Sequence, residues 1–356
     1  MPASGADREA AVRAAFREQG RLCREFGSTL TARVCEALAD GLTRATPLGR
    51  AVLDWPGDPN GWADGLPLRL CGGLHALVRS GRAPALAACY PPNPPPSDEA
   101  LRSALAVAVD AHGGELLPWL DQPPQTNEVG RGAALMAGLL VVADRFGLPI
   151  ALFELGASAG LNLQLDRYAH DLGGVETGDG RSPVRLRPEW DGPPPPHADV
   201  RIATRRGVDL RPADPVRDAE RLLAFVWADQ PARLAQLEGA LALAAADAPR
   251  VDEGDAADWL EARLPVAPQP GRARVVMHSI AWQYFPPGTQ ARVAARIEAA
   301  GEVATPQAPV AWLRFEKDPG QPEITLRLRA WPDGADRLLA SCHTHGRWIR
   351  WHGQAE

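Results

Sequence analysis

The spacing of apolar side chains divides the chain into a helical first third and a mixed remainder. Between residues 7 and 120, apolar residues recur every three or four positions, which places them on one face of a helix. A turn-rich break at 56–60 and a proline run at 91–96 interrupt this pattern, and the prolines exclude a helix interior or a central strand there. We therefore expect an all-α domain over residues 1–124.

Beyond residue 125, short apolar runs of strand length alternate with helical segments. The runs that we assign to strands are 150–153, 200–210, a short one at 251, 274–280 and 310–316, followed by 324–331, 338–343 and 348–351. Strands that alternate with helices predict a parallel α/β sheet, whereas the last three follow one another through short turns and predict antiparallel pairing. A stretch rich in glycine and proline at 170–199 indicates a loop inserted into this α/β domain of residues 125–356, with room for a short strand at 184–187.

The most informative stretch is the strand at 150–153 with the small-residue turn that follows it. Glu154 ends the strand, and the turn contains Gly156, Ala157, Ser158 and Gly160 before a helical segment. Glycines let a backbone bend tightly and approach a ligand, and a helix start offers unpaired N–H groups, so this arrangement is typical of a nucleotide cofactor loop. The same residues also fit the G-x-S-x-G nucleophile elbow of a serine hydrolase, or an ordinary tight turn.

Polar residues before and after this strand are candidates for contact with a ligand. The segment QTNEVGR precedes a helix, 132–146, that is apolar on nearly all sides and must be buried. Its side chains either face a substrate or cofactor or cap the helix, and the two roles are compatible. The candidates are Gln125, Thr126, Asn127, Glu128 and Arg131, with Asn162 from the segment after the turn.

Further candidates follow the carboxyl ends of the other expected strands, where open α/β sheets bind their ligands. Asp209 lies at the end of the strand at 200–210, the place where dinucleotide folds bind ribose hydroxyls. Asp255 and Ala256 begin a helix, so Asp255 either contacts a ligand or caps that helix. The strand at 274–280 and the residues after it supply His278, Ser279, Trp282, Gln283 and Tyr284.

Composition and charge narrow the class of protein. The 356 residues are 45% hydrophobic and 23% charged, with a formal net charge of −6 and no long basic block, which argues against a nucleic-acid partner. Lys317 is the sole lysine, so P-loop and Schiff-base chemistry are disfavoured. The five cysteines are widely spaced and form no C-x-x-C pair, which indicates reduced thiols. His343 and His345 have no further potential metal ligands at regular spacing, so we expect no bound metal. Without an apolar signal core or a run of membrane-spanning length, we expect a cytoplasmic protein with no membrane partner.

Six blocks of the sequence carry a family resemblance. They are QTNEVGR, ELGASAGLNL, RGVDLRPADP, DAADWL, VVMHSIAWQYFPP and HTHGRWIRW. With them the chain resembles, over nearly its full length, the bacterial family catalogued as domain of unknown function 2332. Its second half is similar to the class I fold of methyltransferases that use S-adenosylmethionine (SAM). That similarity implies a Rossmann-like α/β sheet of seven strands in the order 3-2-1-4-5-7-6, with strand 7 antiparallel.

The resemblance also implies roles for the residues at the strand ends. The cofactor loop is matched by Glu154, Gly156, Ala157, Ser158 and Gly160, with serine where the middle glycine is usual. Asp209 matches the ribose-binding acid, Asp255–Ala256 the adenine contact, and His278–Ser279 the start of the motif after strand four. No N/D-P-P-Y/F block follows strand four, which argues against methylation of nucleobase amines.

The function expected from these features is methyl transfer from SAM to a small molecule by in-line displacement. His278 is the candidate base, with Tyr284 and Glu128 as alternates. Contacts with the substrate are expected from Gln125, Thr126, Asn127, Arg131, Asn162, Trp282 and Gln283.

Two alternatives stay open at this point. One is a serine hydrolase with Ser158 as nucleophile, whose acid would be Asp209 or Asp255 and whose base would be a histidine. His278 and His343 both satisfy the chain order for that base. The other is a ligand-binding module without catalysis. The sequence leaves the substrate and the oligomeric state open.

Overall fold

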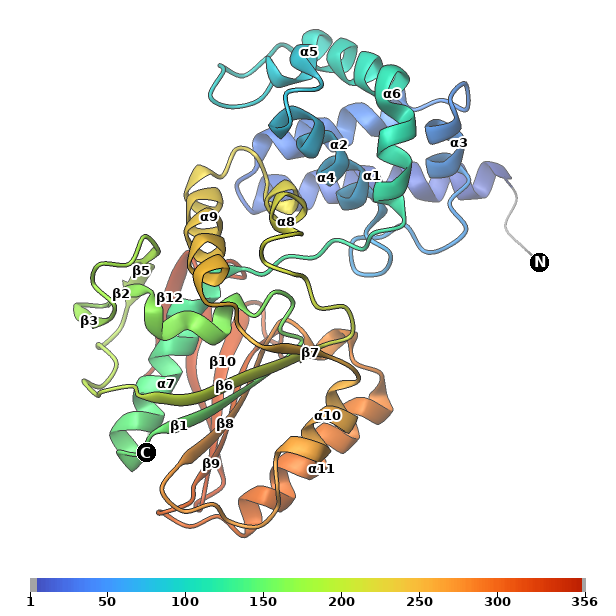
Figure 1. Ribbon diagram of the computed structural model, residues 1–356. Coiled ribbons are helices and arrows are strands. Elements are labelled where there is room, and N and C mark those ends of the chain that lie inside the picture. Colours follow the sequence, from blue (N-terminus) through green and yellow to red (C-terminus); the bar gives the residue numbers. More distant parts are fainter. Residues whose placement is uncertain (1–4, 354–356) are drawn as a thin grey trace. The chain divides into compact units, whose positions relative to one another are not determined.

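The computed structural model describes residues 5–353 and divides them into two compact units, each with its own fold (Figure 1). The helical unit comprises residues 5–126 and 218–234, and the sheet unit comprises 127–217 and 235–353. The all-α domain expected over residues 1–124 corresponds to the helical unit, which also takes in a second, later segment. The chain therefore passes between the two units three times.

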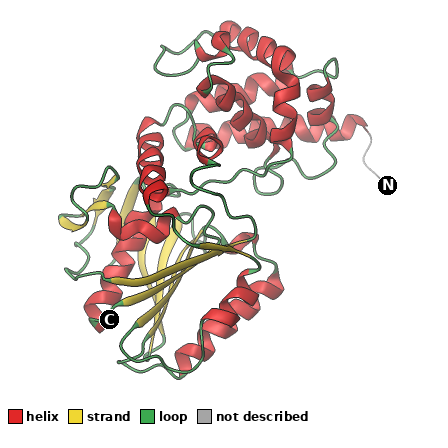
Figure 2. Cartoon of the chain, viewed as in Figure 1, coloured by secondary structure: helices red, strands yellow, loops and turns green. Residues whose placement is uncertain are grey.

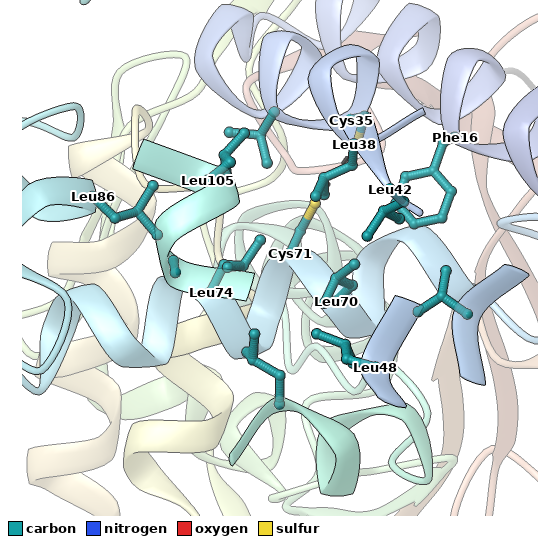
Figure 3. Close-up of a cluster of buried hydrophobic side chains, with 14 of the residues drawn as sticks. Phe16, Cys35, Leu38, Leu42, Leu48, Leu70, Cys71, Leu74, Leu86 and Leu105 are labelled. Atoms are coloured by element: carbon teal, nitrogen blue, oxygen red, sulfur yellow. Dashed lines mark hydrogen bonds between the residues drawn. The ribbon is translucent and has the colours of Figure 1, made fainter. Parts of the chain in front are cut away.

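The helical unit is built around a leucine-rich core. Its helices are α1 (Gly5–Glu25), α2 (Thr29–Gly41), α3 (Pro47–Leu53), α4 (Leu66–Arg79), α5 (Pro84–Ala87), α6 (Asp98–Leu120) and α8 (Ala219–Phe225). Phe16, Leu38, Leu70 and Leu74 are among the buried side chains that pack together between α1, α2 and α4 (Figure 3). Burial of this apolar surface provides the main favourable free energy for the unit. Among residues 5–353, no helix is long and apolar enough to cross a lipid bilayer.

Helix α8 belongs to the helical unit because it packs closely against α4. Phe225 lies over Gly72, where a Cβ atom would come within 2.8 Å of the phenylalanine ring. His75 of α4 bonds through Nδ1 to the carbonyl of Ala224 at 3.1 Å. Burial lowers the pKa of His75, so the ring is neutral near pH 7 and its Nδ1–H donates this bond.

The sheet unit contains one large, mostly parallel sheet. Within the described residues it has nine strands in the order β5-β12-β11-β10-β9-β8-β1-β6-β7. Their bounds are β1 (Ile150–Leu155), β5 (Glu189–Asp191), β6 (Ile202–Asp209), β7 (Val251–Glu253), β8 (Ala273–Ser279), β9 (Val310–Glu316), β10 (Ile324–Trp331), β11 (Ala335–Cys342) and β12 (Trp348–Trp351). Strands β7, β6, β1, β8 and β9 run parallel to one another, so their carboxyl ends share one edge.

The strand order corrects part of what the methyltransferase resemblance implied. Taken in chain order, the five parallel strands lie as 3-2-1-4-5. The implied ending 5-7-6 is wrong, because β10 pairs antiparallel with β9 and β11 pairs antiparallel with β10. Only residues 317–323 join β9 to β10, too few for the crossover that would place another strand between them. The antiparallel pairing predicted from the short turns is confirmed instead.

Helices cover both faces of this sheet (Figure 2). On one face lies α7 (Gly132–Phe146), where a Cβ atom at Gly138 would come within 2.5 Å of Leu313 on β9. On the other face, α10 (Ala256–Arg263) and α11 (Pro287–Glu302) share a buried apolar cluster with Trp312. Neighbouring residues of a strand point to opposite faces, so Leu313 and Trp312 place the helices on opposite sides.

The inserted segment after β1 is more ordered than the loop predicted at 170–199. A 3₁₀ helix, η2 (Leu161–Arg167), replaces the α-helix expected after the glycine turn. Strands β2 (Ala169–Leu172), β3 (Val175–Gly178) and β4 (Arg185–Leu186) then form a small separate sheet, and β5 joins the large one. Helix α9 (Pro231–Ala246) connects the two units before β7.

Candidate functional site

The glycine turn after β1 is bent so tightly that glycine is required at its two ends. Gly156 and Gly160 have φ angles of +70° and +72°, a region that side chains disfavour. A Cβ atom at Gly156 would lie 2.6 Å from the Cβ of Ala281, in the turn after β8. The amides of Gly156 and Ala157 donate to the carbonyl of Val208 at 2.9 and 3.0 Å. The turn is therefore held between the ends of β6 and β8, the strands on either side of β1.

Asp209 fastens the middle of this turn to the end of β6. Its Oδ2 accepts from the amide of Ser158 at 2.8 Å, and its Oδ1 accepts from the amide of Arg211 at 2.9 Å. Burial raises the pKa of Asp209, and these two backbone hydrogen bonds oppose that shift. The structure thus brings Asp209 to the glycine turn, as the positions of the strand ends predicted. Its carboxylate there accepts backbone hydrogen bonds that hold the turn.

Glu154 is a buried carboxyl group directly beneath the turn. It is only 2% exposed, and its Oε2 has no hydrogen-bond partner among the described residues. Burial raises the pKa of Glu154 well above its ordinary value, and the negative charge of Asp209 adds to the rise. The positive charge of Arg131 acts in the opposite direction. A buried polar atom of this kind is costly unless a hydrogen-bond partner satisfies it.

The segment before α7 ties the glycine turn to the turn after β8. Asn127 Oδ1 accepts from the amides of Ala159 and Leu161 at 3.1 and 3.0 Å. Arg131, at the end of the 3₁₀ helix η1 (Val129–Arg131), donates from Nη1 to the carbonyl of Ser279 at 2.9 Å. These bonds hold Asn127 and Arg131 at the carboxyl edge of the sheet.

Not every residue of QTNEVGR belongs to this cluster. Gln125 and Thr126 lie in the helical unit, where Gln125 Oε1 accepts from Arg221 Nη2 at 3.1 Å. Glu128 lies in the sheet unit and is buried, and its carbonyl accepts from Asn162 Nδ2 at 3.5 Å. Asn162 is 1% exposed, and its Oδ1 has no hydrogen-bond partner within residues 5–353.

His278 is fully engaged by its neighbours. Its Nδ1 bonds to Glu316 Oε1 at 2.6 Å, and its Nε2 accepts from Trp312 Nε1 at 3.0 Å. The ring stacks on Trp282 with 5.1 Å between centroids, and the residue is 1% exposed. Because both nitrogens are occupied, His278 has none with which to take a proton in this arrangement.

The remaining candidate residues at this edge differ in burial and in their hydrogen bonds. Asp255 caps α10, accepting from the amides of Ala257 and Asp258 and from the hydroxyl of Thr289. Ala256, the first residue of α10, is buried behind that cap. Trp282 is half-buried, and Gln283 and Tyr284 are exposed, the latter at 59%.

Backbone strain is concentrated at this edge of the sheet. Among the described residues, the non-glycine positions with positive φ are Ser158 (+53°) and Ile280 (+49°). Ser158 follows β1 and Ile280 follows the neighbouring strand β8. A left-handed conformation is especially unfavourable for β-branched isoleucine. Strain of this kind persists where the surrounding structure enforces it, and it is most common at functional sites.

Glu316 is a residue of this region that sequence reasoning did not select. It ends β9, and its Oε1 accepts from His278 and from the amides of Ala281 and Trp282. A carboxylate that accepts three hydrogen bonds at one oxygen organises the turn around it. The one signal in the sequence is that Glu316 lies an even number of positions after Trp312, on the same face of the strand.

The fold and the site together define a mixed α/β protein with a polar, strained cluster at the carboxyl edge of a largely parallel sheet. The chain belongs to the family described as "Uncharacterized protein conserved in bacteria (DUF2332)", whose model matches residues 13–351. The family resemblance seen in the six sequence blocks is thereby confirmed. Searches of curated proteins and of solved structures gave no significant match.

Proposed function

We propose that the protein binds SAM at the carboxyl edge of the sheet and transfers its methyl group to a small molecule. The observation that carries this proposal is that, of the ten buried side-chain polar atoms without a hydrogen-bond partner among the described residues, three lie within residues 154–162, in β1, the glycine turn and η2. They are Glu154 Oε2, Ser158 Oγ and Asn162 Oδ1. Native structures seldom leave such atoms unsatisfied, and we attribute this group of three within residues 154–162 to a bound ligand.

The chemistry of these atoms fits the aminocarboxylate end of SAM. Each of the three can accept a hydrogen bond, and an ammonium group carries three N–H donors. Glu154, when ionised by such a partner, would also supply the matching charge. The order of the five parallel strands and the strained glycine turn add support, because open α/β sheets bind nucleotide ligands at this edge.

The protein's part in the reaction is mainly positioning. When bound, SAM would supply an electrophilic methyl group. Asn127 and Asp209 hold the glycine turn by accepting hydrogen bonds from its amides. Arg131 holds the end of β8 by donating to the carbonyl of Ser279. Orientation of two reactants can contribute about 7–11 kcal/mol, so methyl transfer does not depend on a strong base. His278 acts in this account by fixing the turn after β8, and the exposed Tyr284 takes its place as the candidate general base.

Calorimetric titration with SAM and with its demethylated product, S-adenosylhomocysteine (SAH), tests the proposal. We expect both to bind with dissociation constants of about 1–100 μM, which correspond to binding free energies of about −8 to −5.5 kcal/mol. Absence of binding to either compound would overturn the proposal. Thermal-shift comparison across a panel of metabolites would then show whether another ligand occupies the site.

One observation favours the alternative of a serine hydrolase. Ser158 lies in a G-x-S-x-G turn with a positive φ, as a strained nucleophile elbow requires. Ser158 is only 6% exposed with its hydroxyl buried, however, and both nitrogens of His278 are engaged. Asp255 is occupied as a helix cap. With His278 as base and Asp255 as acid, the geometry therefore supplies no complete triad.

Ser158 gives a clear prediction against the hydrolase. A fluorophosphonate probe should leave the native protein unlabelled, because a buried hydroxyl without a base is a weak nucleophile. Replacing Ser158 by alanine should change the unfolding free energy by no more than about 1 kcal/mol, since the substitution removes an unsatisfied hydroxyl. Stoichiometric labelling of the native protein that disappears in Ser158→Ala would establish the hydrolase instead.

A further inference from the structure

We propose that Glu316 is a positioning residue that holds the turn after β8 against the glycine turn, and so sets the shape of the ligand site. The inference rests on the proposed function in so far as the site binds SAM. Its structural part concerns two turns that belong to the same unit.

The first step is the hydrogen bonding around the carboxylate. Glu316 Oε1 lies 2.6 Å from His278 Nδ1 and accepts from the amides of Ala281 and Trp282 at 3.0 and 3.2 Å. The side chain is 10% exposed, so these donors have little access to water as a substitute partner. Loss of the carboxylate would leave three donors without this acceptor, two of them in buried bonds, which is costly.

The second step is the conformation that these bonds maintain. Ile280 has a φ of +49°, although a β-branched residue disfavours the left-handed region. The amide of Ile280 donates to the carbonyl of Phe315 at 2.9 Å, next to Glu316 on β9. The strained residue is therefore fixed on both sides by the end of β9. Without Glu316, the strain at Ile280 favours relaxation of the turn.

The third step connects the turn to the ligand site. Ala281 lies against Gly156 so closely that a Cβ atom at Gly156 would come within 2.6 Å of the Ala281 Cβ. The position of Ala281 thus limits where the glycine turn can lie. His278 adds rigidity, because its ring stacks on Trp282 while Trp312 occupies its second nitrogen. A change at Glu316 should therefore be transmitted to the residues that bind the cofactor.

The test compares four proteins by hydrogen–deuterium exchange and by SAH titration, under conditions in which circular dichroism shows each to be folded. Glu316→Ala removes the acceptor, whereas Glu316→Gln keeps an acceptor oxygen in nearly the same place. Glu298→Ala, on α11 and paired with Arg329, is the matched control for loss of a carboxylate in the same unit. The wild type completes the set.

We expect Glu316→Ala to exchange about tenfold faster in both segments 280–285 and 156–160, and to bind SAH about tenfold more weakly. Glu316→Gln should restore most of both properties, and Glu298→Ala should match the wild type. If Glu316→Ala does not fold, Glu316→Asp, which withdraws the carboxylate by one methylene, should show the same two effects at smaller size.

Two results would overturn the inference. One is a folded Glu316→Ala or Glu316→Asp protein in which 156–160 exchanges at the wild-type rate. The other is equal loosening of every segment of the sheet unit, which would indicate general destabilisation. If the wild type binds no SAH, the proposed function fails, and the exchange of the ligand-free proteins alone decides the role of Glu316.

Discussion

Replacing Gly156 by alanine is expected to abolish ligand binding and to destabilise the sheet unit. The new Cβ atom would lie 2.6 Å from the Cβ of Ala281, and the residue would keep a φ of +70°. Left-handed strain and overpacking together should lower the free energy of unfolding by about 2–4 kcal/mol. Denaturation monitored by tryptophan fluorescence measures this loss, and SAH titration measures the loss of binding.

Gly147 provides a matched control for that substitution. It ends α7 with a φ of +63°, and no atom lies within 4 Å of the position where its Cβ would be. Gly147→Ala therefore introduces the strain without the contact, and should cost about 1–2 kcal/mol while leaving SAH affinity intact. Equal effects of the two substitutions on binding would show that close packing of the two turns is unimportant.

Substitution of Glu154 by glutamine should have opposite effects on stability and on function. Burial holds the pKa of Glu154 well above its ordinary value, so ionisation of this carboxyl destabilises the ligand-free protein. Glutamine does not ionise, and Glu154→Gln should stabilise the ligand-free protein by about 1–2 kcal/mol near pH 8. SAH affinity should fall roughly tenfold or more, because the negative charge opposite the ligand ammonium is lost.

The dependence on pH gives this prediction a definite sign. A carboxyl group with a raised folded-state pKa stabilises the fold below its unfolded pKa, about 4.3, and loses that contribution as pH rises through the folded value. The advantage of Glu154→Gln should therefore be small near pH 4 and grow towards pH 8. Glu298→Gln, at a half-buried ion pair with Arg329, serves as the control. A constant difference across this range would mean that Glu154 titrates as an ordinary carboxyl.

The fold was predictable where local pattern alone determines it. Alternating strands and helices indicated a parallel sheet, and the short turns after residue 316 indicated antiparallel strands. The error came from the resemblance, which implied that a later strand inserts between β9 and β10. Residues 317–323, which join β9 to β10, are too few for the crossover connection that parallel strands need. The short turns in the sequence therefore predicted the pairing better than the family resemblance did.

The site was predictable only in part, for a related reason. Glu154, Gly156 and Asp209 were expected to meet because the carboxyl ends of parallel strands share one edge. The partners of His278 could not be foreseen, since Trp312 and Glu316 lie on another strand, more than 30 residues away along the chain. Which residues of a polar stretch face a site depends on tertiary contacts of this kind.

Division of the chain between units likewise escaped prediction. QTNEVGR is continuous and polar at its start, yet its first two residues lie in the helical unit and the next five in the sheet unit. No change in composition marks that boundary. Asn127 belongs to the sheet unit, where it bonds to the glycine turn, and the sequence alone does not reveal those bonds.

A crystal structure of the protein grown with SAH tests the central claim most directly. The account predicts SAH at the carboxyl edge of β1, with its ammonium group within hydrogen-bonding distance of Glu154 Oε2, Ser158 Oγ and Asn162 Oδ1. SAH bound away from this edge would contradict it. So would crystals without SAH in which these three atoms bond to one another or to ordered water.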